Sequence, residues 1–140
     1  MNRSRISNAL SEYNSISVTG GVEDATPHRL IQMLMEGALD KIATAKGHIL
    51  HRDMAEKGRH ISWAISIVGG LQNSLDMEAG GEISANLDNL YDYMIRRLVE
   101  AGVQNDPAIL DEVSSLLLEV KSAWDVIPRQ LASESRKATS

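Results

Sequence analysis

Residues 80–98 read Gly-Gly-Glu-Ile-Ser-Ala-Asn-Leu-Asp-Asn-Leu-Tyr-Asp-Tyr-Met-Ile-Arg-Arg-Leu. The two glycines interrupt the chain, and a long helical pattern follows them. Apolar residues recur at steps of three and four, which places them on one face of a helix. They are Ile83, Leu87, Leu90, Met94, Leu98 and Ala101. Tyr91 and Ile95 widen this stripe beyond the seam of a two-stranded coiled coil, so we expect the helix to contact more than one neighbour.

The same period recurs before this stretch. Thr26-Pro27 predicts the start of a helix that runs to about residue 51, because threonine caps helices and proline suits the first helical position. Asp53 and Glu56 predict a capping box at the start of a second helix, which ends near Leu75. Gly69-Gly70 lies inside that helix and indicates either the close approach of a neighbouring helix or a bend beside a binding groove.

A further helix follows the central stretch. Asp106-Pro107 repeats the signal of a cap and a proline, and Pro128 is expected to end or kink this last helix. At the N-terminus, Ile6, Leu10 and Tyr13 have the spacing of a short amphipathic helix, which must dock on something to persist.

These elements predict an all-α fold. Long helices joined by short turns become antiparallel neighbours, so we expect an antiparallel four-helix bundle with a short extra N-terminal helix. The predicted domain covers residues 1–132, of which 1–24 form a mobile N-terminal segment. Residues 133–140 are predicted to be a disordered tail.

Composition excludes several classes of function. The formal net charge of −5 gives no broad attraction for nucleic acid or an anionic membrane. The chain has no cysteine, which excludes disulfides, thiol nucleophiles and thiolate metal sites. No stretch is long and apolar enough to insert into a bilayer, and no secretory signal begins the chain, which is compatible with the cytosol.

The sequence also offers little for catalysis or metal binding. A di-iron bundle needs inward Glu-x-x-His pairs, and the chain has none. His48 and His51 could share a metal with Asp53, but a solvated helix end explains them better. His28 and His60 are expected on the surface. We therefore predict a protein that is not an enzyme, with no catalytic residues, no cofactor and no metal.

What remains is a surplus of apolar residues beside the core-forming stripes. This surplus is either ordinary core or a groove for an amphipathic segment, and methionine suits the packing of varied partners. The candidate groove residues are Leu30, Met33, Leu34, Met35, Trp63, Ile67, Tyr91 and Met94. A bundle that self-associates, or an adaptor, is the alternative interpretation, and a four-helix metalloenzyme is a weaker one.

Several motifs follow one another along the chain in a specific order. They are Tyr13-x-x-Ile16-x-Val18, the run Ala-Thr-Pro-His-Arg-Leu-Ile-Gln-Met-Leu-Met-Glu-Gly-Ala at 25–38, Leu75-Asp76, the central motif at 80–98, Glu112-Val113 and Ala123-Trp124. In these motifs the chain resembles the FliS family over nearly its whole length. Three positions depart from the family pattern. Thr26 replaces serine, Met35 an aromatic residue and Glu36 aspartate, and these changes affect little beyond the shape of a groove.

The resemblance implies a cytoplasmic chaperone for flagellin. Such a protein binds the C-terminal segment of flagellin, prevents premature polymerisation and aids delivery to the type III flagellar export apparatus. One flagellin per chaperone is expected, and the export gate and an anti-sigma factor are further candidate partners. The resemblance also implies that the N-terminal segment, here Leu10, Tyr13, Ile16 and Val18, covers part of the groove when no client is bound.

Overall fold

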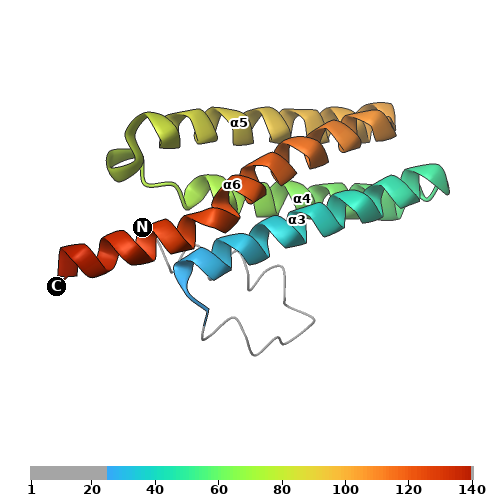
Figure 1. Ribbon diagram of the computed structural model, residues 1–140. Coiled ribbons are helices and arrows are strands. Elements are labelled where there is room, and N and C mark those ends of the chain that lie inside the picture. Colours follow the sequence, from blue (N-terminus) through green and yellow to red (C-terminus); the bar gives the residue numbers. More distant parts are fainter. Residues whose placement is uncertain (1–24, 140) are drawn as a thin grey trace.

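The computed structural model describes residues 25–139, and the side chains of residues 25–127. Within this range the chain forms α3 (Pro27–Leu50), α4 (Met54–Asn73), α5 (Met77–Gln104) and α6 (Pro107–Thr139), and no strand (Figure 1). The prediction of an all-α helical bundle is confirmed. The N-terminal helix and the mobility of residues 1–24 were predictions, and they concern residues outside the described range.

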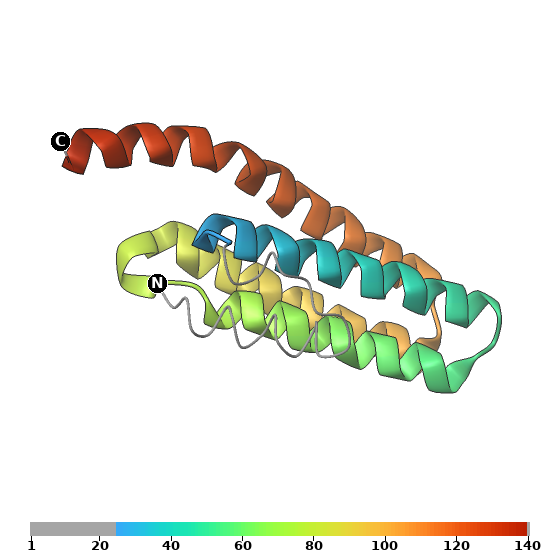
Figure 2. The ribbon, with the colours of Figure 1, turned by 90° about the horizontal axis from the view of Figure 1, so that it is seen from below.

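The helices alternate in direction along the bundle. Each one packs against its neighbours in sequence, and α6 returns to close the ring against α3. The C-terminal half of α6 diverges from α5 and extends beyond the other helices (Figure 2). One end of the bundle is therefore more open than the other.

The core comes from all four helices. Its largest fully buried side chains are Leu30, Leu34, Met35, Ile42, Val68, Leu71, Met94, Leu98, Leu110 and Leu117. Met94 and Leu98 lie on the stripe that the sequence predicted for the central helix, whereas Leu30, Leu34 and Met35 had been named as groove candidates. Ile83 is an exception, because it is 72% exposed although the pattern placed it on the buried face of the central helix. Its part of α5 lies where α6 diverges, so none of the described helices covers it.

The predicted helix starts are confirmed by their caps. Thr26 Oγ1 accepts from the Arg29 N–H at 3.1 Å, and Asp53 Oδ1 accepts from the Glu56 N–H at 3.3 Å. At α6, Asp106 Oδ1 accepts from the Ala108 N–H at 2.9 Å. These bonds satisfy helix N–H groups that have no partner within the helix.

The sequence predicted a turn at the glycine pair followed by a long helix, and a long helix does follow it. A short helical stretch that starts at Met77 was not predicted, and the two stretches, joined across a kink at Gly81, together make up α5. The Asp76 carboxylate caps it by accepting from the N–H groups of Glu78 and Ala79 at 3.1 and 3.0 Å. The backbone hydrogen bond from Ala79 contributes most to lowering the pKa of Asp76.

The two glycines form the bend that separates the short first stretch of α5 from its long second stretch. Gly81 has φ 51° and ψ −125°, a conformation open essentially to glycine alone. A Cβ at Gly80 would lie 1.7 Å from Ser84 Oγ, which donates to the Asp76 carbonyl at 3.0 Å. The bend therefore needs glycine at both positions.

Two observations on the other helices bear on the sequence predictions. Helix α6 continues through Pro128 to Thr139, so it does not end at the proline, while the kink there and the disordered tail over 133–140 stay predictions. A proline removes only one N–H donor, so a helix can continue past it when the following residues are compatible with helix. A Cβ at Gly69 would meet no atom within 4 Å, so the close helix approach predicted for the glycine pair does not hold at this position.

A polar network joins α5 to α6 at the closed end. The Tyr93 hydroxyl donates to Glu112 Oε2 at 2.7 Å, and Arg97 Nε donates to Glu112 Oε1 at 2.7 Å. Arg97 also pairs with Glu100 at 2.6 Å. The Tyr93 bond and then the Arg97 bond lower the pKa of Glu112.

Glu112→Gln is expected to flatten the loss of stability in acid. As the pH falls below the ordinary Glu112 value of 4.5, the unfolded chain takes up a proton before the folded chain does. The free energy of unfolding therefore falls with pH until the lowered native pKa is passed, and the glutamine variant lacks this contribution. Urea titrations across the acid range measure the slope. Glu82→Gln, at an exposed position, should keep the wild-type slope, and an equally steep loss in Glu112→Gln would contradict the prediction.

Candidate functional site: an apolar groove between α5 and α6

Two adjoining cavities open between α5 and α6. The first has a volume of about 220 Å³ and is lined by Ile31, Met35, Ser74, Leu75, Asp76, Ile83, Ser84, Leu87, Tyr91, Val120 and Trp124. The second has a volume of about 320 Å³ and is lined by Ile83, Leu87, Glu119, Val120, Ala123, Trp124 and Ile127. Because four residues line both, we treat them as one feature, the α5–α6 groove.

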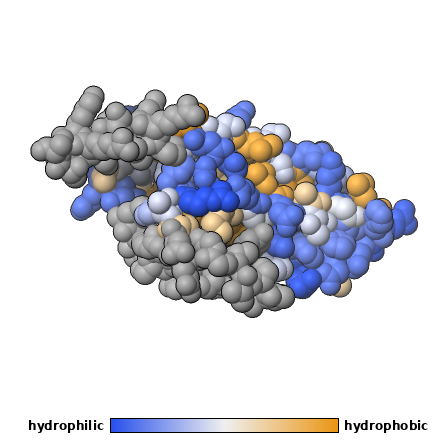
Figure 3. Space-filling model, turned by 60° about the horizontal axis from the view of Figure 1, so that its bottom comes forward, coloured by the Kyte–Doolittle hydropathy of each residue, from blue (hydrophilic) through white to orange (hydrophobic). Residues whose placement is uncertain are grey.

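The groove exists because two helices separate. After the bend at Gly81, residues of α5 and of the diverging part of α6 line the two sides of the cavity. Ile83 and Leu87 lie on one wall and Val120 on the other. Charged side chains among the lining residues are limited to Asp76 and Glu119. The surface turned forward in Figure 3 is mostly hydrophilic, with apolar atoms gathered in limited patches.

Tyr91 joins the groove to the core. It is 3% exposed, belongs to the core cluster and also lines the first cavity. Burial raises the pKa of its hydroxyl to about 12, so the side chain is neutral at physiological pH. Its ring is therefore an apolar part of the groove with a protonated hydroxyl.

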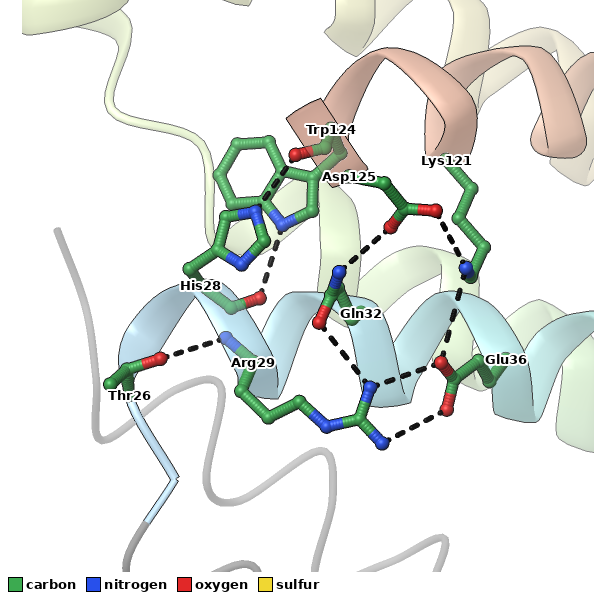
Figure 4. Close-up of polar contacts among 8 residues, drawn as sticks. All are labelled: Thr26, His28, Arg29, Gln32, Glu36, Lys121, Trp124 and Asp125. Carbon is green, nitrogen blue, oxygen red and sulfur yellow. Dashed lines mark hydrogen bonds and ion pairs between the residues drawn. The ribbon is translucent and has the colours of Figure 1, made fainter. Parts of the chain in front are cut away.

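A clamp between His28 and Trp124 fixes the far wall of the groove. The two rings stack with centroids 4.9 Å apart and planes at 6° (Figure 4). Trp124 Nε1 donates to the His28 carbonyl at 3.1 Å, and His28 Nε2 lies 2.8 Å from the Trp124 carbonyl. His28 can donate this second bond when Nε2 carries the proton. The paired bonds and the stacking hold the diverging part of α6 to the start of α3.

Polar contacts beside the clamp extend this attachment. Gln32 Nε2 donates to Asp125 Oδ1 at 2.8 Å, and Lys121 Nζ donates to Asp125 Oδ2 at 2.9 Å. These contacts lower the pKa of Asp125, with the Lys121 bond contributing most. On the same side, Arg29 pairs with Glu36 at 3.0 Å (Figure 4). The groove wall is thus held at several points on α3.

The structure divides the predicted groove residues into separate places. Met35 and Tyr91 line the groove. Leu30, Leu34, Ile67 and Met94 are buried in the core, and Met33 and Trp63 pack partly buried against it without lining the groove. Leu10, Tyr13, Ile16 and Val18 lie outside the described residues.

Most of the apolar lining residues were not among the groove candidates that the sequence offered. They are Ile31, Leu75, Ile83, Leu87, Val120 and Trp124. The helical period correctly marks them as apolar positions, but it carries no information on which stripe loses its neighbour. Two histidines that were expected on the surface are covered by other residues. His60 is only 8% exposed, and the His28 ring stacks on Trp124.

No helix among the described residues is sufficiently long and apolar to cross a membrane. The fold and the groove together define a class of protein, an all-α bundle that presents an apolar groove with few charges. The family described as Flagellar protein FliS matches residues 9–131, and this chain belongs to it.

Curated relatives support the same assignment. The flagellar secretion chaperone FliSB of Pseudomonas aeruginosa is 55% identical over 119 residues, which cover 85% of this chain and 94% of the relative. The flagellar secretion chaperone FliS of Salmonella typhimurium is 43% identical over 129 residues, which cover 91% of this chain and 96% of the relative. The flagellar secretion chaperone FliS of Vibrio cholerae is 39% identical over 120 residues, which cover 86% of this chain and 88% of the relative. The resemblance found in the motifs is thus confirmed, and the family is one of flagellar export chaperones.

Proposed function

We propose that this protein binds the C-terminal segment of flagellin in the cytoplasm, prevents its premature polymerisation and aids its delivery to the type III flagellar export apparatus. The observation that carries the proposal is the α5–α6 groove in a member of a chaperone family. A groove with apolar walls and few charges suits a segment that must hide an apolar face. We propose one flagellin per chaperone, with the export gate and an anti-sigma factor as further candidate partners.

The groove also suggests how a client is held. Each cavity is comparable in size to a few side chains, so a segment would place successive apolar residues between Leu87 and Val120. Ordering a disordered segment costs about 2–5 kcal/mol of the gross contact energy. Residues 1–24, with Leu10, Tyr13, Ile16 and Val18, are proposed to cover part of the groove when it is empty.

Removing the C-terminal segment of flagellin is expected to abolish the complex. Monomeric flagellin and the truncated form are titrated into the protein by calorimetry, and filament growth is measured in parallel. The full-length client should bind in a one-to-one complex and stop elongating filaments. Equal affinity for the two forms would contradict the proposed mode of binding. Formation of stable oligomers without any client would instead favour the self-association bundle.

Ile83→Glu is expected to weaken flagellin binding by about tenfold or more, because burying an isoleucine contributes about 1.5–3 kcal/mol. Val103→Glu is the matched control, since Val103 is on the same helix, is 77% exposed and does not line the groove. Both variants should unfold at nearly the wild-type temperature, because neither side chain is buried. Equal losses of affinity in the two variants would show that charge on α5, and not the groove, matters.

A further inference from the structure

Three potential metal ligands meet where α3 ends and α4 begins, at the end of the bundle away from the α5–α6 groove (Figure 1). They are His48 from α3 and Glu56 and His60 from α4. One ligand atom from each lies within 4.8 Å of the others. The sequence pointed to a different set, because His48 and His51 are closer along the chain. Folding instead brings His60 beside His48, with ring centroids 5.1 Å apart.

One of the two histidines is already oriented by a hydrogen bond, and the other has a longer contact with a carboxylate. His60 Nδ1 lies 2.8 Å from the Glu56 carbonyl oxygen and 3.6 Å from Glu56 Oε2. When Nδ1 donates to the carbonyl, Nε2 remains as the ligand atom. His48 Nδ1 lies 3.9 Å from Asp53 Oδ2. A histidine that binds zinc commonly gives its other ring nitrogen to a carbonyl or a carboxylate, which fixes the ring and the tautomer. His60 is also buried, so its ring position is held by packing.

We propose that His48, Glu56 and His60 form a binding site for a divalent transition metal of the zinc type. Two imidazoles and one carboxylate are a zinc ligand set, with water in the fourth position. The ligand atoms must approach to about 3.4 Å from one another, the spacing of a tetrahedral site with bonds near 2.1 Å. The side chains of His48 and Glu56 are 28% and 40% exposed, so they have room to rotate toward the fixed His60 ring.

Charged and aromatic side chains surround the three proposed ligands. Glu56 now pairs with Arg59 at 2.9 Å, so metal binding exchanges this surface ion pair for a ligand bond. Lys41 lies 4.0 Å above the Trp63 ring, and that ring lies 6.1 Å from His60. The metal would connect the end of α3 to the first two turns of α4 across the intervening turn. Binding only to the folded chain would raise its stability by mass action.

Calorimetric titration of the full chain with Zn²⁺ tests the site, and unfolding temperature with and without the metal gives a second readout. We expect one Zn²⁺ per chain and a rise in unfolding temperature that a chelator reverses. His48→Ala should weaken binding by at least about tenfold, since losing even an outer partner of a zinc ligand costs 10–100-fold. His48 is only partly buried, so this variant should still fold.

His51→Ala is the matched control. His51 is an exposed histidine at the same helix end, with its Nδ1 3.1 Å from the Gly47 carbonyl. The His51→Ala variant should bind Zn²⁺ with wild-type affinity. Equal weakening in both variants, unchanged affinity in His48→Ala, or no stoichiometric binding by the wild type would overturn the proposal. In a Trp124→Phe background, where Trp63 is the remaining tryptophan of the sequence, Cu²⁺ should quench the fluorescence, and adding His48→Ala should reduce this quenching.

Discussion

Replacing Tyr91 with alanine is expected to lower the free energy of unfolding by about 3–5 kcal/mol, the cost of truncating a large buried aromatic residue. The side chain is 3% exposed and part of the core cluster, so its loss opens a cavity between the core and the groove. Because Tyr91 also lines the groove, the remaining folded protein should bind flagellin less tightly. Urea denaturation measures the first effect and calorimetric titration the second.

Tyr91→Phe is the control for this prediction. It keeps the ring and removes only the hydroxyl, so we expect the free energy of unfolding to stay within about 1 kcal/mol of the wild type. If alanine and phenylalanine lower stability equally, the hydroxyl and not the volume of the ring would be the stabilising feature. If alanine leaves stability unchanged, Tyr91 would not be part of the core.

The fold could be predicted from the sequence because its signals are local and agree with one another. Thr26, Asp53 and Asp106 each cap a helix through a bond to a residue two or three positions ahead. Apolar residues between the caps repeat with the helical period, which is enough to orient each helix in a bundle. The break at the glycine pair was located correctly, but the short helical stretch before it, which ends at the positive φ of Gly81, was not predicted.

The groove could not be predicted in the same way, because an apolar stripe looks identical whether or not another helix covers it. Leu34 and Ile83 both belong to periodic apolar patterns, yet the first is fully buried and the second is 72% exposed. The difference arises from the divergence of α6, which the clamp between His28 and Trp124 fixes. These two residues are 96 positions apart, and nothing in the sequence near either indicates the pairing.

Lys57 is a charged residue whose burial could likewise not be predicted from the local sequence. In the run of polar residues at the start of α4 it has the pattern of a solvated side chain, yet it is buried. Its Nζ donates to the Gly102 carbonyl at 2.9 Å and to Asn105 Oδ1 at 2.7 Å. The antiparallel arrangement of α4 and α5 places this ammonium group at the negative end of the α5 dipole. The lysine thus satisfies a carbonyl that the helix itself leaves without a partner.

We expect Lys57→Met to lower the free energy of unfolding by about 2–3 kcal/mol. Hydrogen bonds to charged groups contribute about 1.5–3 kcal/mol, and a buried acceptor left unsatisfied costs about 1–3 kcal/mol. Methionine keeps most of the apolar stem, so the change reports the lost ammonium and not lost packing. Urea denaturation measures the effect, and amide exchange in the last turn of α5 should become faster than in the middle of the helix.

Lys46→Met is the matched control, because Lys46 pairs with Asp111 at 2.9 Å on the surface between α3 and α6. Exposed ion pairs contribute about 0–1 kcal/mol, so this variant should be nearly as stable as the wild type. Equal effects in the two lysine variants would mean that net charge, and not the capping of α5, determines the result. A loss limited to Lys57→Met would identify Lys57 as a buried cation that holds the start of α4 to the end of α5, at the end of the bundle opposite the groove.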